Sequence, residues 1–284
     1  MIHKLGLGTV LFGMDYGLDN QISKLEINSI LDDFSSKGNY FLDTAREYGN
    51  SEYNIGSFIT EKKVKLFIST KLKKINFNSN LEKDILDSVK ESLNNLNLNK
   101  IDLLSLHQVD KEIIDSDCLW KVISELKLKN IINYFGVSVY DEDDIKVILN
   151  NHLDKIDYIQ LPYSIIDKRF ESLFKVLKLN NIKIVARSVF LRGYLTEKVT
   201  EKFKVNNYIQ ELYELNPQLK KYALKKLAFD FVYFNDYIDY VIFGVANKHQ
   251  LNDLINLSNS KTIDFINIIW PKEISRDIYD PRKW

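Results

Sequence analysis

The chain alternates eight short apolar runs with longer segments of helical period, and this alternation limits the possible folds more than any other feature of its 284 residues. Several runs are apolar on both faces, as in Val241–Val245, which is typical of parallel strands that are covered on both sides. The predicted strands are Leu5–Thr9, Tyr40–Thr44, Lys65–Lys71, Asp102–His107, Tyr134–Val139, Tyr158–Tyr163, Lys183–Ser188 and Tyr240–Val245.

The segments between these runs have the apolar spacing of amphipathic helices. Leu81–Leu93 places its apolar side chains on one stripe, and Ile22–Leu31 does the same, with Ser23 as its expected N-cap and Glu26 three residues later. Further helices are expected to begin near Ser51, Asp117, Glu142, Lys168, Pro217 and Lys248.

Eight strand signals, each followed by a helix signal, predict a parallel α/β sheet. Eight is also the number of strands that closes a barrel, whereas a doubly wound open sheet usually has fewer. We therefore predict an eight-stranded parallel (β/α)8 barrel of the TIM type. Barrels of this kind typically have about 250 residues, so residues 1–284 are expected to form a single domain.

Composition narrows the classes of function. The 39 basic and 39 acidic side chains cancel, so no long-range field attracts nucleic acid or an anionic membrane. The lone Cys118 and the lack of a long apolar run favour the cytoplasm, and the sequence carries no signal of oligomeric state. The histidines do not pair with Cys118 or with one another, so no metal site is predicted; they are His3, His107, His152 and His249.

Four polar side chains lie at or just after the ends of three predicted strands. In a (β/α)8 barrel, chemistry takes place at this end, so Asp43, Tyr48, Lys71 and His107 are expected to meet on one rim. Taken singly, each residue has a simpler explanation. Asp43 can cap a helix and Tyr48 can be a packing residue, while Lys71 can reach solvent and His107 can form a hydrogen bond with the backbone. Their joint placement is harder to explain by chance.

The four residue types suit the protonation of an oxygen. A tyrosine hydroxyl has a reference pKa of about 10, and a nearby ammonium is expected to lower it. A carboxylate keeps the lysine charged and in place. A neutral histidine can then orient a substrate carbonyl by donating a hydrogen bond from one ring nitrogen. Such a group can protonate a carbonyl oxygen while hydride arrives at its carbon.

These residues also carry a resemblance to a known family. Residues 41–56, Phe-Leu-Asp-Thr-Ala-Arg-Glu-Tyr-Gly-Asn-Ser-Glu-Tyr-Asn-Ile-Gly, closely resemble the signature of the aldo-keto reductases around their catalytic aspartate and tyrosine. Ser69–Lys71 and Asp102–His107 resemble the lysine and histidine strands of that family. The resemblance continues through Gly136–Ser138, Gln160–Tyr163, Ala186–Ser188 and Val241–Leu251, and so spans nearly the whole chain.

The resemblance implies an NADPH-dependent carbonyl reductase with a small-molecule aldehyde or ketone as substrate. Asp43, Tyr48, Lys71 and His107 would form the catalytic tetrad, with Tyr48 as general acid. The cofactor would lie extended across the barrel mouth, without a glycine-rich turn. The residues expected to bind it are Thr9, Ser138, Gln160, Arg187, Ser188, Leu191, Arg192, Gly244, Asn247, Lys248 and Gln250.

Within that set, Ser138 and Gln160 match positions that hold the nicotinamide carboxamide, and Arg187 stands where many relatives stack an aromatic ring on the nicotinamide. The Ser188–Arg192 loop is expected to meet the pyrophosphate. Two departures stand out. Val139 replaces an asparagine that is common at the carboxamide site. Gly244 and Gln250 stand where NADPH-specific relatives often carry a cation, which leaves Lys248 as the nearby cation and NADH as an open alternative.

Two segments suggest details of the substrate site. The N-terminal stretch Leu5–Gln21 resembles a subset of aldo-keto reductases from bacterial surface-polysaccharide pathways, which implies a sugar-derived carbonyl substrate. The long connection Leu191–Asn216 is either a lid over the ligand or an extra helix away from the site.

Two other functions remain open. A nicotinamide-binding regulatory or accessory subunit would bind cofactor but turn over little substrate. A barrel isomerase or lyase would bind no nicotinamide at all.

Overall fold

Eight parallel strands close into a barrel in the computed structural model, which describes residues 4–17, 19–75, 80–196, 205–272 and 275–280. Each strand pairs with the next in chain order, and the eighth pairs with the first, which confirms the predicted (β/α)8 TIM barrel. All eight predicted strands are present, with ends that differ by no more than two residues. The strands are β1 Leu5–Gly8, β2 Phe41–Asp43, β3 Phe67–Lys71, β4 Ile101–Leu106, β5 Ile132–Ser138, β6 Tyr158–Pro162, β7 Lys183–Arg187 and β8 Tyr240–Gly244.

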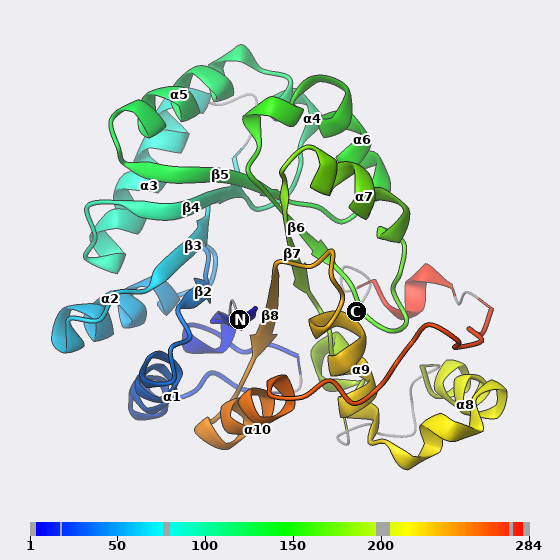
Figure 1. The fold of residues 1–284 in the computed structure, drawn as a ribbon. Helices are drawn as coiled ribbons and strands as arrows, with labels where there is room; N and C mark the ends of the chain where they lie inside the picture. Colours follow the sequence, from blue (N-terminus) through cyan, green and yellow to red (C-terminus); the bar gives the residue numbers. More distant parts are fainter. Residues whose placement is uncertain (1–3, 18, 76–79, 197–204, 273–274, 281–284) are drawn as a thin grey trace.

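Helices surround this barrel (Figure 1). They are α1 Lys24–Ser36, α2 Ser51–Lys62, α3 Leu81–Leu96, α4 Lys111–Ile114, α5 Asp117–Leu128, α6 Glu142–Asn151, α7 Glu171–Leu179, α8 Val205–Leu215, α9 Leu224–Tyr233 and α10 Lys248–Ser258. Ser23 caps α1 as predicted, because its Oγ accepts the backbone N–H of Glu26 at 3.3 Å. The helix expected near Pro217 starts later, since Pro217–Lys221 forms a 3₁₀ turn before α9. No helix in the described ranges is long and apolar enough to cross a membrane.

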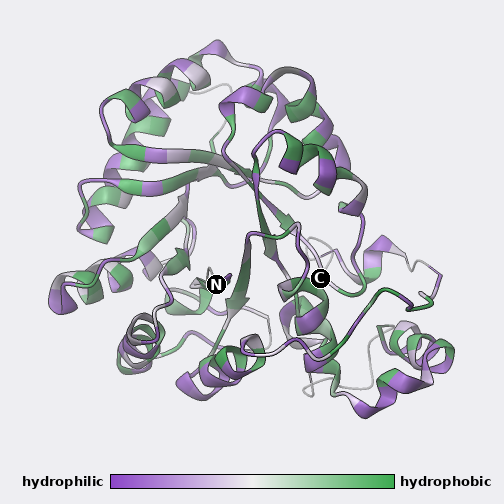
Figure 2. Cartoon of the chain, viewed as in Figure 1, coloured by the Kyte–Doolittle hydropathy of each residue, from purple (hydrophilic) through white to green (hydrophobic). Residues whose placement is uncertain are grey.

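Apolar side chains of the helices face the strands, as the amphipathic pattern requires. Figure 2 shows mostly hydrophobic strands inside helices whose colours alternate along their length. In α1, for example, Ile27, Ile30, Leu31 and Phe34 are all buried. Burying a side chain of this size stabilises the fold by about 1.5–3 kcal/mol, so the helix packs against the barrel with this face.

Aromatic rings fill the barrel at the end where its strands begin. Phe41, Phe67, Tyr158 and Tyr240 open β2, β3, β6 and β8, and they pack together inside the barrel. The ring centroids of Phe41 and Tyr240 lie 4.4 Å apart, and those of Phe41 and Phe67 lie 5.0 Å apart. This layer fills the end of the barrel where the strands begin, and the cavity lies at the other end, where the strands finish.

The long connection after β7 has two parts, one at the open end of the barrel and one outside the ring of helices. Its first residues approach the open end of the barrel, where Arg192, Gly193 and Thr196 line a cavity. Helix α8 lies outside the ring of helices, at the lower right of Figure 1, and none of its residues lines that cavity. The connection therefore contains the extra helix, and only its start can cover a ligand among the described residues.

Candidate active site

A cavity of about 710 Å³ occupies the open end of the barrel. The four side chains predicted to meet there, Asp43, Tyr48, Lys71 and His107, all line it. They come from the ends of β2, β3 and β4 and from the loop after β2. Neighbouring parallel strands bring their carboxyl ends to one rim, and this register explains the convergence.

Asp43 and Lys71 form a buried ion pair. The Lys71 Nζ lies 2.7 and 2.8 Å from the two carboxylate oxygens of Asp43 and donates a third hydrogen bond to the backbone oxygen of Thr44 at 3.0 Å. Burial lowers the pKa of the Lys71 ammonium, and the Asp43 carboxylate opposes this change. Charges are costly to remove from water, so a pair this deeply buried indicates a functional role more than a stabilising one.

Two glycines fix the loop that carries Tyr48. A Cβ on Gly13 would lie 1.8 Å from the backbone oxygen of Tyr48, a separation that no side chain can occupy. Gly49 has φ of +52° and packs against Gly13, where a Cβ would lie 2.3 Å from the Gly13 oxygen. The loop after β1 and the loop after β2 therefore touch backbone to backbone, and this contact holds Tyr48 over the cavity.

The Tyr48 ring lies between the lysine and the histidine. The Lys71 Nζ is 5.3 Å from the ring centroid, and the His107 ring packs edge-on with centroids 5.7 Å apart. Burial, followed by the Asp43 carboxylate, raises the pKa of the Tyr48 phenol well above 10. The pKa of the phenol is thus raised and not lowered as expected, because burial and the Asp43 carboxylate outweigh the positive charge nearby. The phenol is therefore a fully protonated donor.

His107 is neutral near pH 7. Burial and the nearby Lys71 ammonium lower the pKa of its imidazole to about 4, and the carboxylates of Glu47 and Asp43 oppose this shift only in part. The predicted neutral histidine is thus supported by the charges around it.

We expect the His107 imidazole to titrate near pH 4 and to show no inflection near its ordinary pKa of about 6.5. The folded-state pKa is below that of the unfolded chain. Acidification from about 6.5 to 4 therefore protonates the unfolded state first and destabilises the barrel, while at pH 7 the residue contributes no such effect. Histidine NMR signals followed against pH measure this, with His107→Gln to assign the resonance. A midpoint at the ordinary value would contradict the expectation.

The two residues predicted to hold a carboxamide face each other in the sheet. Ser138 and Gln160 are register partners on β5 and β6, and both line the cavity. The Gln160 Nε2 donates a hydrogen bond to the Asp43 carboxylate at 2.8 Å. Its amide oxygen therefore remains as an acceptor for a ligand amide, and its amide nitrogen ties this part of the cavity to the ion pair.

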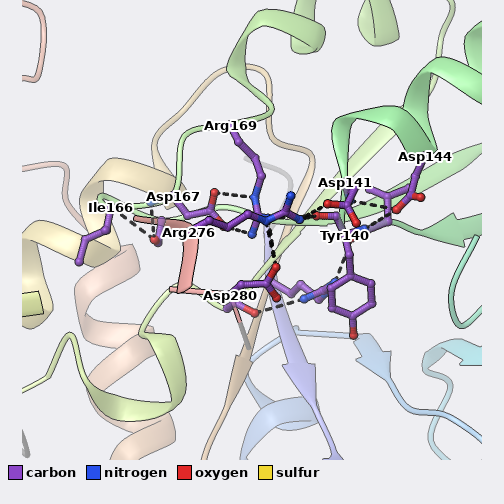
Figure 3. A network of polar contacts seen from close by, with 12 residues as sticks. Tyr140, Asp141, Asp144, Ile166, Asp167, Arg169, Arg276 and Asp280 are labelled. Atoms are coloured by element: carbon purple, nitrogen blue, oxygen red, sulfur yellow. Dashed lines mark hydrogen bonds and ion pairs between the residues drawn. The ribbon is translucent and has the colours of Figure 1, made fainter. Parts of the chain in front are cut away.

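Arg187 stacks on a tyrosine that the sequence reasoning missed. Its guanidinium carbon lies 4.2 Å from the centroid of the Tyr140 ring, and it donates to the backbone oxygen of Val139 at 3.0 Å. The backbone oxygen of Tyr140 accepts hydrogen bonds from Arg169 and Arg276 at 3.1 and 2.9 Å. Figure 3 shows these arginines in one network, so the segment at 276–280 fixes the loop that presents Tyr140 to the cavity.

The loop after β7 contains three non-glycine residues in the left-handed region. Ser188, Leu191 and Arg192 have φ of +62°, +46° and +55°. Such backbone costs about 1–3 kcal/mol for each residue and is typical of ligand-binding loops. Ser188 and Arg192 line the cavity, whereas the Leu191 side chain is buried in the core, so Leu191 contributes to this loop through its backbone.

Three other predicted cofactor residues lie outside the cavity lining. Thr9 is buried, and its hydroxyl donates to the backbone oxygen of Asp43 at 3.0 Å. Asn247 caps α10 by accepting the backbone N–H of Gln250 at 2.9 Å. Lys248 forms an ion pair with Asp33 at 3.2 Å. These contacts give all three residues a structural role.

Gly244 and Gln250, which were expected to bind cofactor, line the far end of the cavity together with Lys225 of α9. Lys225 lies 3.3 Å from Asp253 of α10. Lys248, which the sequence suggested as the nearby cation, pairs with Asp33 outside the cavity lining, and Lys225 lines the cavity instead. No local sequence motif marks Lys225, because its position depends on helices joined only through the barrel.

Glu47 is a further cavity residue that was missed, although it precedes Tyr48 in the signature. Its carboxylate Oε2 lies 3.3 Å from the Nδ1 of His107. Tyr16, from the loop after β1, lines the same part of the cavity. No cluster of three metal-ligating side chains occurs within the described part of the chain.

Known proteins are similar to this chain in sequence and in architecture. The model of the aldo/keto reductase family matches residues 4–269. The uncharacterized oxidoreductase YqkF of Bacillus subtilis is 27% identical over 92% of this chain and 89% of its own length.

Among solved structures, the apo form of aldo-keto reductase AKR11C1 from Bacillus halodurans matches with a TM-score of 0.74 and 25% identity, over 92% of this chain and 88% of that one. Its holo form matches with a TM-score of 0.77 and 24% identity over the same shares. The match of the family model over nearly the whole chain is decisive: this protein belongs to the aldo/keto reductase family.

Proposed function

We propose that this protein reduces an aldehyde or ketone to an alcohol with NADPH, and that Tyr48 is the general acid. Membership of the family supports oxidoreductase activity on carbonyl compounds. The observation that carries the finer proposal is the position of a protonated phenol beside the buried Lys71–Asp43 pair, in a cavity that continues to α10.

The cavity suits an extended dinucleotide. Ser138 and Gln160 would hold the carboxamide, Ser188 and Arg192 would meet the pyrophosphate, and Lys225 would meet a phosphate at the far end. When bound, the nicotinamide supplies hydride to the carbonyl carbon.

Side chains of the protein act on the carbonyl oxygen of the substrate. The Tyr48 hydroxyl donates its proton to the developing alkoxide, and the Lys71 ammonium stabilises the phenolate that remains. Asp43 keeps that ammonium charged and in place. His107, which is neutral, contacts the substrate beside Tyr48.

The substrate end of the cavity favours a hydroxylated carbonyl compound such as a sugar derivative. Tyr16, Glu47 and Tyr140 present polar side chains to it. A carboxylate and phenols form hydrogen bonds with hydroxyl groups, which a purely apolar carbonyl compound lacks. This lining supports the proposal of a sugar-derived substrate.

Calorimetric titration with NADPH and NADH, followed by a carbonyl panel that includes keto-sugars, tests the proposal. We expect Lys225→Ala to weaken NADPH binding by roughly 10-fold, the scale of one charge-assisted hydrogen bond, and to change NADH binding little. The matched variant Lys248→Ala removes a cation that pairs with Asp33 outside the cavity, and is expected to bind NADPH as the wild type does.

Each outcome of these measurements has a different meaning for the proposal. A loss of NADPH affinity in Lys248→Ala but not in Lys225→Ala would contradict the placement of the phosphate. Tight cofactor binding with no turnover of any carbonyl would favour an accessory subunit. Absence of binding to either nucleotide would overturn the oxidoreductase proposal.

A further inference from the structure

We infer that Arg276 and Asp280, which lie outside the cavity, are positioning residues that act on the cofactor through the loop after β5. They fix the position of Tyr140 in this loop, and Tyr140 in turn holds the Arg187 guanidinium in the cavity. The cofactor part of this inference rests on the proposed function, whereas the effect on the loop does not.

Four charged side chains form a largely buried cluster behind the loop (Figure 3). We call Asp167, Arg169, Arg276 and Asp280 the ion cluster. Arg169 donates to both carboxylate oxygens of Asp167, at 2.8 and 2.6 Å, and its Nη1 lies 3.7 Å from Asp280. Arg276 donates to Asp280 at 3.0 Å. Asp167 and Asp280 are only 1% and 0% exposed, so removal of a guanidinium leaves a buried carboxylate short of a partner.

The ion cluster is joined to the loop at one backbone oxygen. The oxygen of Tyr140 accepts hydrogen bonds from Arg169 at 3.1 Å and from Arg276 at 2.9 Å, and Arg276 also forms an ion pair with Asp141. On the other side of the residue, the N–H of Tyr140 donates to the Asp144 carboxylate at 2.8 Å. Both polar backbone groups of Tyr140 therefore bond to charged side chains, and such bonds are the stronger kind.

The same loop holds the Arg187 guanidinium. Its carbon lies 4.2 Å from the centroid of the Tyr140 ring, and its Nη2 donates to the backbone oxygen of Val139 at 3.0 Å. A guanidinium can stack with its face on an aromatic ring while its edge donates hydrogen bonds. Since both contacts come from two consecutive residues, a shift of the loop also moves the guanidinium.

Arg187 brings a positive charge close to the proposed reacting side chains. Burial is the main cause of the lowered pKa values of Lys71 and His107, and the Arg187 charge lowers both further. Arg187 also lines the cavity together with Ser138 and Gln160, which are proposed to hold the carboxamide. A displaced guanidinium therefore changes the wall of the cavity against which the nicotinamide is proposed to bind.

A simpler explanation is that the ion cluster only anchors the segment 275–280 to the barrel. No residue of this segment lines the cavity, whereas Tyr140 and Arg187 both do. An effect of Arg276 on the cofactor must therefore pass through the loop, and it must depend on Arg187. A mere anchor would show no such dependence, and a double-mutant cycle measures it.

Hydrogen exchange in the free protein tests the first step. The N–H groups of Tyr140 and Asp141 both donate to Asp144, and NMR follows their exchange rates. We expect Arg276→Met to raise both rates roughly 10-fold, because the loop opens more often without the guanidinium. Asp280→Asn, which keeps the shape of the side chain and removes its charge, is expected to raise them as well.

The matched control is Lys272→Met. Lys272 lies four residues before Arg276 in the chain and is exposed, so this variant removes a cation close by in the sequence. We expect it to leave both exchange rates unchanged.

Calorimetric titration with NADPH tests the second step. We expect Arg276→Met to weaken NADPH binding roughly 10-fold on its own, and to have no further effect when Arg187→Met is already present. Lys272→Met is expected to bind NADPH as the wild type does. Circular dichroism shows whether each variant is folded at the temperature of the titration, and Asp280→Asn replaces Arg276→Met in both measurements if the latter does not fold.

Unchanged exchange rates in Arg276→Met would overturn the inference. A loss of NADPH affinity that is equally large with and without Arg187 would also overturn it, because the ion cluster would then act independently of the guanidinium. If the wild type binds neither NADPH nor NADH, the proposed function fails, while the exchange rates still decide whether the ion cluster holds the loop.

Discussion

Replacing Tyr48 with phenylalanine is expected to lower kcat by at least about 10²–10⁴-fold, the range that general acid catalysis contributes, while NADPH binding stays nearly unchanged. The variant removes one oxygen atom and retains the ring that packs against His107 and faces Lys71. Steady-state rates of NADPH oxidation and a calorimetric Kd measure the two effects separately.

The control for this variant is Tyr53→Phe. Tyr53 lies five residues further along the chain, on α2, and is 57% exposed, so loss of its hydroxyl affects neither the cavity nor the core. Equal activity of Tyr48→Phe and the wild type would refute the assignment of the acid. Equal losses of turnover and of NADPH affinity would instead indicate that Tyr48 mainly binds cofactor.

The pKa of Tyr48 bears on how this acid works. Its phenol is held protonated by burial and by Asp43, so it is a full donor at neutral pH and a weak acid in the barrel as it stands. Proton transfer from such a group requires a positive charge that responds as the alkoxide develops. Lys71, 5.3 Å from the ring centroid, is the group in place to provide it.

The barrel was predictable because its signals are local. Each strand is a short apolar run covered on both faces, and each is followed by a longer segment with the apolar stripe of a helix, so the length and pattern of the runs together identify them. The ends of the helices and strands were harder to predict. The 3₁₀ turn at Pro217–Lys221 delays α9, because proline fixes its own backbone but does not commit the next residues to a helix.

Four site residues were predictable from one rule, since the strand ends of a barrel share a rim. Tyr140 and Lys225 were not predicted, because each reaches the cavity through contacts that the sequence does not display, whereas Glu47 lies beside Tyr48 in the signature and was overlooked. Tyr140, for instance, is fixed by Arg276, which is 136 residues away in the chain. The sequence likewise gives no sign that Lys248 has a partner, but in the folded chain it forms an ion pair with Asp33.

Lys71→Met is expected to cost about 3–5 kcal/mol of unfolding free energy and to abolish turnover. The side chain is 1% exposed, and its removal leaves the Asp43 carboxylate buried with Ser69 and Gln160 as its side-chain donors among the described residues. Methionine is similar in length to lysine, so the main loss is the charge. Urea unfolding followed by circular dichroism measures the first effect, and NADPH oxidation measures the second.

The double variant Asp43→Leu/Lys71→Met is expected to separate the effect of Lys71 on stability from its effect on catalysis. Replacing both members of a buried ion pair with apolar groups is often neutral or stabilising, because no unpaired charge remains. We therefore expect the double variant to recover most of the free energy of unfolding that Lys71→Met loses, and to recover none of its turnover, since the charge beside Tyr48 is still absent. Recovery of both would mean that Lys71 acts only on folding. Recovery of neither would mean that Asp43 and Lys71 do not compensate each other as a pair.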